Sequence, residues 1–169
     1  GQDSASSADS VFRHPVTGVV LDSPLHELPK VFAVMIENSA DAWPLSGIED
    51  AFLVIEAPVE GGIPRFEAFF TEEIEVDKIG PVRSARPYYL DWADELEALY
   101  AHVGGSPEAI NLIQDYGTQD LNEFYQGEYF WRDTASRAAP HNVYTSIAQL
   151  SESLSEFEWQ LPGYKNWLF

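Results

Sequence analysis

The sequence predicts an α/β fold, with one domain built on a mixed sheet of about four to five strands and flanking helices. Apolar, strand-like segments alternate along the chain with segments of helical periodicity, which is the order typical of α/β proteins. A Gly-Gly turn joins two of the strand segments as a hairpin, so part of the sheet should be antiparallel. With 169 residues, 45% of them hydrophobic, the chain can bury one such core. We place the domain at residues 31–158.

Two segments precede this domain. Residues 1–10 are small and polar, as expected of a flexible tether. Residues 11–30 contain three prolines and show neither helical nor strand periodicity, so we expect an extended arm that lies on the domain. The chain begins with Gly, and its one methionine is Met35. We therefore expect that a signal or anchor preceded the tether, and we favour an exported protein over a trimmed cytoplasmic one.

The first half of the domain should supply three strands. Residues 31–37 form a continuous apolar run, the pattern of a strand that is covered on both faces. A loop and a short helical turn follow, and Ser46 is placed to cap that turn. Residues 51–57 have the composition of a second buried strand, and residues 63–70 that of a third. The turn at residues 60–62 joins these two strands as the hairpin.

The second half should begin with a helix over residues 87–97, because a proline suits its first turn and apolar residues recur at helical spacing. Residues 98–103 follow as a fourth strand. After a Gly-Gly turn, Ser106 is placed to cap a second helix, which opens with a proline and ends at Gly117.

The last segments complete the predicted domain. Residues 128–133 are interpreted as a fifth strand and residues 146–157 as a final helix. Residues 159–169 end in aromatic side chains with no polar exit. We interpret them as the start of a linker toward a missing C-terminal domain.

The acidic composition limits the partners. Lys and Arg together number 9 against 28 Asp and Glu, which gives a formal net charge of −19. Such a surface repels nucleic-acid phosphates and anionic lipids. We therefore expect a soluble monomer with no nucleic-acid partner, which meets a membrane only through a missing N-terminal anchor. The chain has no cysteine, which excludes disulfides, thiolate metal ligands and cysteine catalysis.

Positive charge is scarce, yet five of the six arginines lie between Arg65 and Arg137. Arg83 and Arg86 are three residues apart, and at helical spacing they would share a face and clamp an anionic ligand. The alternative is that each arginine pairs with a buried carboxylate, for which Glu37, Glu56 and Glu60 are available. Both interpretations stay open.

Two histidines stand beside loops that suit a ligand site. His102 lies near the end of the fourth strand, directly before Gly-Gly-Ser-Pro, and ligands of open α/β sheets bind at the carboxyl ends of strands. That motif is also simply a good turn and cap. His141 lies in the segment RAAPHN, between Arg137 and Asn142, where it would serve as a general acid or base or as a hydrogen-bond donor. The alternative is a histidine whose ring is satisfied within the protein.

Common cofactor and hydrolase signatures are absent from the sequence. It contains no Walker A, GxGxxG, GxSxG, HxxxH or HxH motif. We therefore expect no nucleotide, no cofactor and no metal, although whether a divalent metal joins the acids near the histidines stays open.

Several segments, in matching order over about residues 15–150, resemble the YerB-type bacterial lipoprotein family of unknown function (N-terminal domain). The most specific are IGPVRSAR (79–86), HVGGSP (102–107) and PHN (140–142). The chain departs from the family pattern with Glu37 in place of a common Asp and Pro64 in place of a common Thr. The resemblance implies an extracytoplasmic, lipid-anchored bacterial protein with a second, C-terminal domain, and it implies no assigned activity. Matching positions are Arg65, Arg83, Arg86, His102, Ser106, Arg132, Arg137, His141 and Asn142.

Three functional hypotheses follow. The leading one is a cell-envelope module that binds an anionic small molecule or cell-wall-derived fragment in a cleft. Its ligand-binding residues would be Arg83, Arg86, His102, Ser106, Arg137, Asn142, Arg65 and Glu60. The second is an envelope hydrolase or transferase in which His141 is the acid or base, Arg83 and Arg86 stabilise developing charge, and Glu37 or Glu60 orients the histidine. The third is a scaffold whose arginines form buried salt bridges. The sequence does not decide whether the protein is an enzyme.

Overall fold

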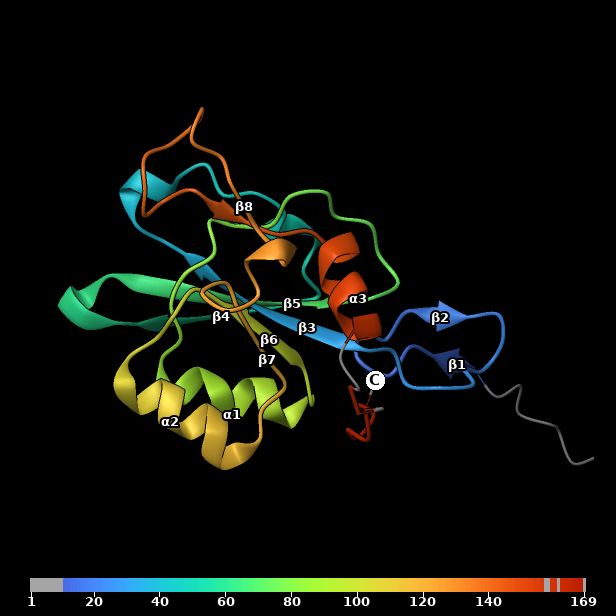
Figure 1. Cartoon of the computed structure of the whole chain (residues 1–169). Coiled ribbons are helices and arrows are strands. Elements are labelled where there is room, and N and C mark those ends of the chain that lie inside the picture. Colours follow the sequence, from blue (N-terminus) through green and yellow to red (C-terminus); the bar gives the residue numbers. More distant parts are fainter. Residues whose placement is uncertain (1–10, 157–158, 161, 169) are drawn as a thin grey trace, which may run out of the picture.

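A computed structural model describes residues 11–156, 159–160 and 162–168. At its centre lies a five-stranded mixed sheet in the order β4-β5-β3-β6-β7, with α1 and α2 on one face and α3 on the other (Figure 1). The strands are β1 (Phe12–Arg13), β2 (Val20–Leu21), β3 (Val31–Glu37), β4 (Leu53–Pro58), β5 (Pro64–Thr71), β6 (Leu99–His102), β7 (Asp120–Asn122), β8 (Trp131–Arg132) and β9 (Val143–Tyr144). The α-helices are α1 (Pro87–Glu95), α2 (Pro107–Tyr116) and α3 (Ile147–Glu156). The predicted α/β fold with a mixed sheet is confirmed.

The central strand β3 determines where the ends of the sheet lie. It pairs in antiparallel fashion with β5 and in parallel with β6, and β6 pairs in parallel with β7. The carboxyl ends of these three parallel strands, at Glu37, His102 and Asn122, therefore meet at one edge of the sheet. All residues of β3 are buried, as its continuous apolar run predicts.

Two hydrophobic cores lie on opposite faces of the sheet. Side chains such as Ala33 and Met35 pack beneath α1 and α2, whereas their neighbours Val34 and Ile36 face α3 and the loops beside it. The second helix has the predicted ends. Ser106 Oγ accepts a hydrogen bond from the Ala109 N–H at 3.2 Å, and Gly117 follows α2 in the left-handed conformation.

The predicted fifth strand is wrong. Residues 127–129 form the 3-10 helix η4 (Gly127–Tyr129), and among the described strands β8 pairs only with β9, outside the main sheet. The fifth strand of the sheet is β7, which the sequence conceals because it is three residues long and mostly polar. Its residues are part-buried or buried because α2 returns the chain alongside β6.

Two expectations for the hairpin region also need correction. The strand β4 was expected to be buried, but its burial alternates because it is an edge strand with one face toward solvent. Ser46 does not cap a helical turn, since it pairs with Gly80. The nearest helical turn is η2 (Ile48–Asp50), preceded by Gly47. A further turn, η1 (Ala40–Ala42), lies in the loop after β3, and the hairpin turn itself is η3 (Glu60–Gly62).

In the arm, which shows no strand periodicity in the sequence, β1 and β2 pair as a short antiparallel hairpin outside the main sheet. Two of the described residues after α3 contact the arm. The Trp167 N–H donates to the Pro15 carbonyl at 2.9 Å, and the Tyr164 hydroxyl donates to the Pro29 carbonyl at 2.7 Å. The predicted tether at residues 1–10 lies outside the described residues. Among the described residues, no helix has the length and apolar character needed to cross a bilayer.

Candidate functional site

Residues 82–86 cross the carboxyl ends of β3 and β6. The Arg83 N–H donates to the Met35 carbonyl at 2.9 Å, and the Arg83 carbonyl accepts from the Val103 N–H at 3.0 Å. The segment therefore lies outside the ends of parallel strands, where open α/β sheets bind their ligands. The expectation that Arg83 and Arg86 share a helical face is wrong. Arg86 has extended backbone angles, as is typical of a residue before proline, and α1 begins only after it.

A cleft of about 350 Å³, the main cleft, opens at this edge of the sheet. Its lining residues come from five separate segments: Arg83, Ser84, Val103, Gly104, Gly105, Phe124, Arg132, Pro140 and Val143. Among the described residues, two arginines and no carboxylate line it. Both charged side chains that line the cleft are therefore positive, on a chain of net charge −19.

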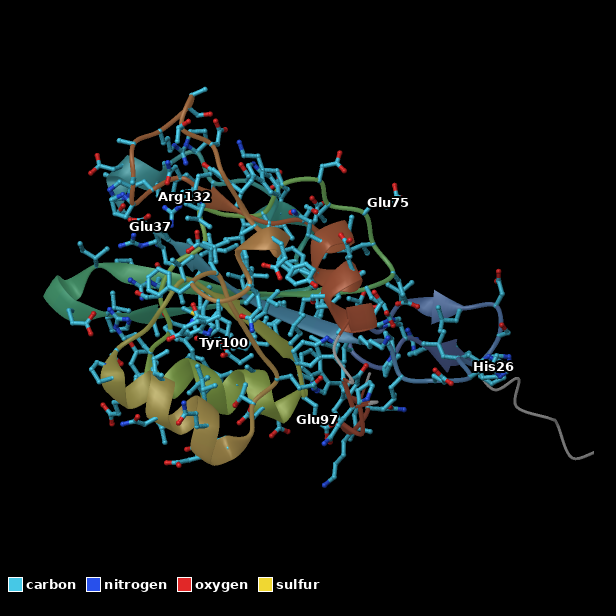
Figure 2. All side chains as sticks on the ribbon, viewed as in Figure 1. His26, Glu37, Glu75, Glu97, Tyr100 and Arg132 are labelled. Carbon is cyan, nitrogen blue, oxygen red and sulfur yellow. The ribbon has the colours of Figure 1, made fainter. Side chains whose placement is uncertain are left out.

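Arg132 is held in place from two sides. Its Nη2 lies 2.9 Å from Glu123 Oε1, and its Nη1 donates to Asn142 Oδ1 at 3.4 Å. Asn142 is itself buried and donates from Nδ2 to the Arg137 carbonyl at 3.3 Å. Asn142 therefore positions Arg132 and does not face the cleft as a ligand contact. Figure 2 shows Arg132 and Glu37 at the same end of the molecule, near β8.

Arg83 is held between the cleft and a buried acid. Its Nη1 donates to the Pro140 carbonyl at 3.2 Å. Its Nε lies 3.5 Å from Glu37 Oε2, within ion-pair distance but without the alignment of a hydrogen bond, and this nitrogen is buried. Arg83 therefore retains hydrogen-bonding capacity that no described residue satisfies.

Glu37 and His141 form a carboxylate–histidine pair beside the cleft. The side chain of Glu37 is 6% exposed, and both of its oxygens accept from His141 Nδ1, at 2.8 and 2.9 Å. The Ser39 hydroxyl donates to the same carboxylate at 2.7 Å. Because Nδ1 carries the donated proton, the neutral ring presents Nε2 as an acceptor, and Nε2 has no partner among the described residues. The geometry fits a general base or a hydrogen-bond acceptor.

Arg65 is a buried arginine with no carboxylate at ion-pair distance among the described residues. It is 6% exposed, and its Nη1 donates to the Ser84 carbonyl at 2.6 Å and to Ser84 Oγ at 3.4 Å. Burial, followed by the charges of Arg86 and Arg83, lowers the pKa of Arg65 below its ordinary value. Three like charges are thus held close together, with Ser84 among them.

Arg86 lies in a second cleft, of about 450 Å³. It is bound to Glu60, with Nε at 2.7 Å from Oε1 and Nη2 at 2.8 Å from Oε2. The Arg86 guanidinium lowers the pKa of Glu60 to about 2. Ser106 and Glu108 line the same cleft. Arg86 is therefore paired with an acid that is 69% exposed, not with a buried one as the scaffold hypothesis expects.

The structure separates His102 and Arg137 from the main cleft. His102 is fully buried, its Nδ1 donates to the Gly104 carbonyl at 2.7 Å, and its Nε2 contacts the Asp120 carboxylate. Arg137 donates to the Pro44 carbonyl at 2.7 Å and to the Tyr144 hydroxyl at 3.1 Å. Both side chains tie loops together, so their ligand-binding roles have no support in this geometry.

Two residues of the cleft escaped the sequence reasoning. Neither Ser84 nor Phe124 was among the predicted site residues. Had β7 been recognised, the carboxyl-end rule would have placed the residues after Asn122, including Phe124, at the same edge. Because β7 was not predicted, Phe124 was not assigned to the site.

Comparisons with known proteins agree with the fold. The family described as "Protein of unknown function (DUF3048) N-terminal domain" matches residues 16–160. A Bacillus subtilis (strain 168) protein named "Putative lipoprotein YerB" is 32% identical over 166 residues, which are 98% of this chain and 49% of that protein. The crystal structure of YerB protein from Bacillus subtilis matches with a TM-score of 0.81 and 32% identity, over 92% of this chain and 53% of that one. The chain spans about half the length of both.

Proposed function

This chain belongs to the family of the DUF3048 N-terminal domain, whose function is unknown, and from that premise we propose that its main cleft binds an anionic small molecule or cell-wall-derived fragment. The observation that carries the proposal is that Arg83 and Arg132 line one cleft, which no described carboxylate lines. Each arginine also pairs with an acid that does not line the cleft, Arg132 with Glu123 and Arg83 with Glu37, so two guanidinium groups but no described carboxylate face a ligand there.

The chemistry of the lining supports this ligand class. Guanidinium groups bind carboxylates and phosphates through paired hydrogen bonds, and such charge-assisted bonds are stronger than neutral ones. Arg132 is positioned by Glu123 and Asn142, so little side-chain freedom remains to be lost on binding. Arg65, buried behind Ser84 without a described carboxylate partner, adds positive charge near the site.

The proposed location follows from the relative named as a lipoprotein. We place the activity of this chain outside the cytoplasm of a bacterium, at a membrane to which a lipid anchor holds the whole protein. Wall-derived sugars, peptides and phosphorylated fragments are the anions available there, which is why they are the proposed ligands.

Calorimetry at low ionic strength tests the proposal. The panel is inorganic phosphate, a muramyl dipeptide and a glycerol phosphate oligomer. Arg132→Gln is expected to weaken binding by about 10-fold or more, because a hydrogen bond to a charged group contributes about 1.5–3 kcal/mol. Arg13→Gln on β1 is the matched control, since it removes the same charge away from the cleft. Binding that is absent throughout the panel, or that Arg13→Gln weakens equally, would contradict the proposal.

A second candidate function is hydrolysis or group transfer on an envelope substrate, and the Glu37–His141 pair favours it. In hydrolysis, His141 Nε2 would take a proton from the attacking water and return it to the leaving oxygen, while Glu37 stabilises the imidazolium. Arg83 would stabilise the negative charge that develops. His141→Gln should abolish turnover of wall fragments while leaving their binding intact. Turnover that survives this substitution would remove the role.

A further inference from the structure

Phe124 is an exposed aromatic residue on the wall of the main cleft. It lines the cleft together with Arg83 and Arg132, and it is 65% exposed. Scattered exposed aromatic residues are common on protein surfaces and need no explanation. Phe124 differs in that its backbone and its ring are both held in position.

The buried side-chain amide of Asn122 links the backbone at Phe124 to the backbone at Gly104. Asn122 Oδ1 accepts hydrogen bonds from the Gly104 N–H at 2.9 Å and from the Phe124 N–H at 3.2 Å. Asn122 is buried at the end of β7, and its own N–H donates to the Gln126 side chain at 2.9 Å. The loop that carries Phe124 is therefore fixed to the turn after β6.

The ring of Phe124 packs against a glycine. Gly104 has a φ of +59°, and a Cβ added there would lie 2.6 Å from Cε2 and 3.1 Å from Cζ of Phe124. A residue with a side chain at position 104 would displace the ring as well as strain the backbone. The ring is thus supported by Gly104 on one side, while most of its surface stays open to solvent.

Hydrogen-bonding groups lie beside the ring. Ser84 Oγ accepts from Arg86 at 3.1 Å and from Arg65 at 3.4 Å, and its own hydrogen has no acceptor among the described residues. The cleft volume of about 350 Å³ is at the small end of the range for small-molecule sites. An inorganic anion would use the arginines and this hydroxyl but not the ring. A small ring that bears hydroxyls and one acidic group would use all of them.

We infer that the ligand of the main cleft is an acidic saccharide, whose sugar ring packs on Phe124 while its carboxylate or phosphate binds Arg83 and Arg132. This inference rests on the proposed anion-binding function and specifies the ligand. The apolar face of a sugar ring meets the aromatic ring, and a sugar hydroxyl accepts from the hydroxyl of Ser84.

Three probes separate the parts of this ligand: D-glucuronate has ring and charge, acetate has charge alone, and methyl glucoside has ring alone. Their affinities are measured by amide chemical-shift titration of the whole chain. The wild-type protein is expected to bind glucuronate about five-fold or more tighter than acetate. Phe124→Ala is expected to remove this preference without changing the affinity for acetate, and Phe124→Trp to keep it. Tyr125→Ala is the matched control, because Tyr125 is the neighbouring exposed aromatic residue and does not line the cleft.

Each contrary outcome has one meaning. If acetate and glucuronate bind equally at Arg83 and Arg132, or if Phe124→Ala keeps the preference, the saccharide inference is wrong and anion binding stands. If neither anion shifts the amides around Arg83 and Arg132, both proposals fall. If methyl glucoside binds as tightly as glucuronate, the charge is irrelevant and the acidic part of the inference is wrong.

Discussion

His141 donates its Nδ1 proton to the carboxylate of Glu37, at 2.8 and 2.9 Å, across 104 residues of sequence. This contact joins the end of the central strand to the loop that follows β8. Through the Arg83 Nε, 3.5 Å from the same carboxylate, it also reaches the wall of the main cleft. Glu37 is therefore the acid around which the loops of the site assemble.

Glu37 and Glu60 can be compared directly, because each contacts one arginine and, of the two, Glu37 is buried whereas Glu60 is exposed. Glu37→Gln should lower the free energy of unfolding by about 3 kcal/mol, since it leaves a partly buried arginine without its acid. Glu60→Gln should cost less than about 1 kcal/mol, because exposed ion pairs contribute little. Urea unfolding measures both. Equal costs would mean that Glu37 does not organise the site.

The buried carboxyl group of Glu67 should make the stability of the protein depend on pH. Its side chain is fully buried in β5, neither oxygen has a partner among the described residues, and burial raises its pKa well above the ordinary value of 4.5. The folded state therefore retains a proton that the unfolded state releases above about pH 4.5. The contribution of Glu67 to stability is full below that pH and falls as the pH rises toward the folded-state pKa.

Glu67→Gln isolates this effect, because glutamine does not titrate. Relative to this variant, the free energy of unfolding of the wild-type protein should fall by up to about 1.4 kcal/mol per pH unit above pH 4.5, until the folded-state pKa of Glu67 is reached. Urea unfolding at pH 4, 6 and 8 gives the difference in unfolding free energy between the two proteins, in which the contributions of all other titrating groups cancel. A difference that stays constant across this range would show that Glu67 does not retain the proton.

The fold was predictable where apolar runs were long, and the errors have local causes. The runs that became β3, β5 and β6 are recognisable because their residues are buried on both faces. Residues 120–122 are not, since their burial depends on α2 returning beside β6. The shared helical face of Arg83 and Arg86 failed because a proline follows Arg86 and keeps it extended.

The site was predictable as a gathering of arginines, and Glu37 and Glu60, two of the acids named as possible partners, do pair with Arg83 and Arg86; which arginine meets which acid was not predictable. Which arginine meets an acid depends on how separate loops come together. Arg86 meets Glu60 from the hairpin turn, whereas Arg132 meets Glu123 from the loop after β7. No periodicity or motif in the sequence encodes such contacts between loops.

His102 provides a test between a structural and a ligand-binding role. Both ring nitrogens are engaged within the protein, so His102→Asn should cost about 2–3 kcal/mol of stability through lost hydrogen bonds in a buried site. Thermal unfolding measures the loss, and titration with phosphate measures the affinity. A variant that is as stable as the wild-type protein but binds phosphate more weakly would restore His102 to the ligand-binding set.

Gly104 and Gly117 test the support beneath the Phe124 ring. Both have left-handed backbones, with φ of 59° and 69°, but a Cβ at Gly117 meets open space. Gly117→Ala should therefore cost about 1 kcal/mol for the backbone alone. Gly104→Ala should cost clearly more, because Phe124 must also move. Similar losses in urea unfolding would show that the ring does not pack against Gly104 in solution.

The central claim, that Arg83 and Arg132 together bind an anion, is tested most directly by anomalous diffraction from crystals soaked in selenate. The account predicts one selenium peak in the main cleft, within hydrogen-bonding distance of both guanidinium groups, and its loss from crystals of Arg132→Gln. Selenate found only elsewhere on the protein, or a peak that the substitution leaves unchanged, would contradict the claim.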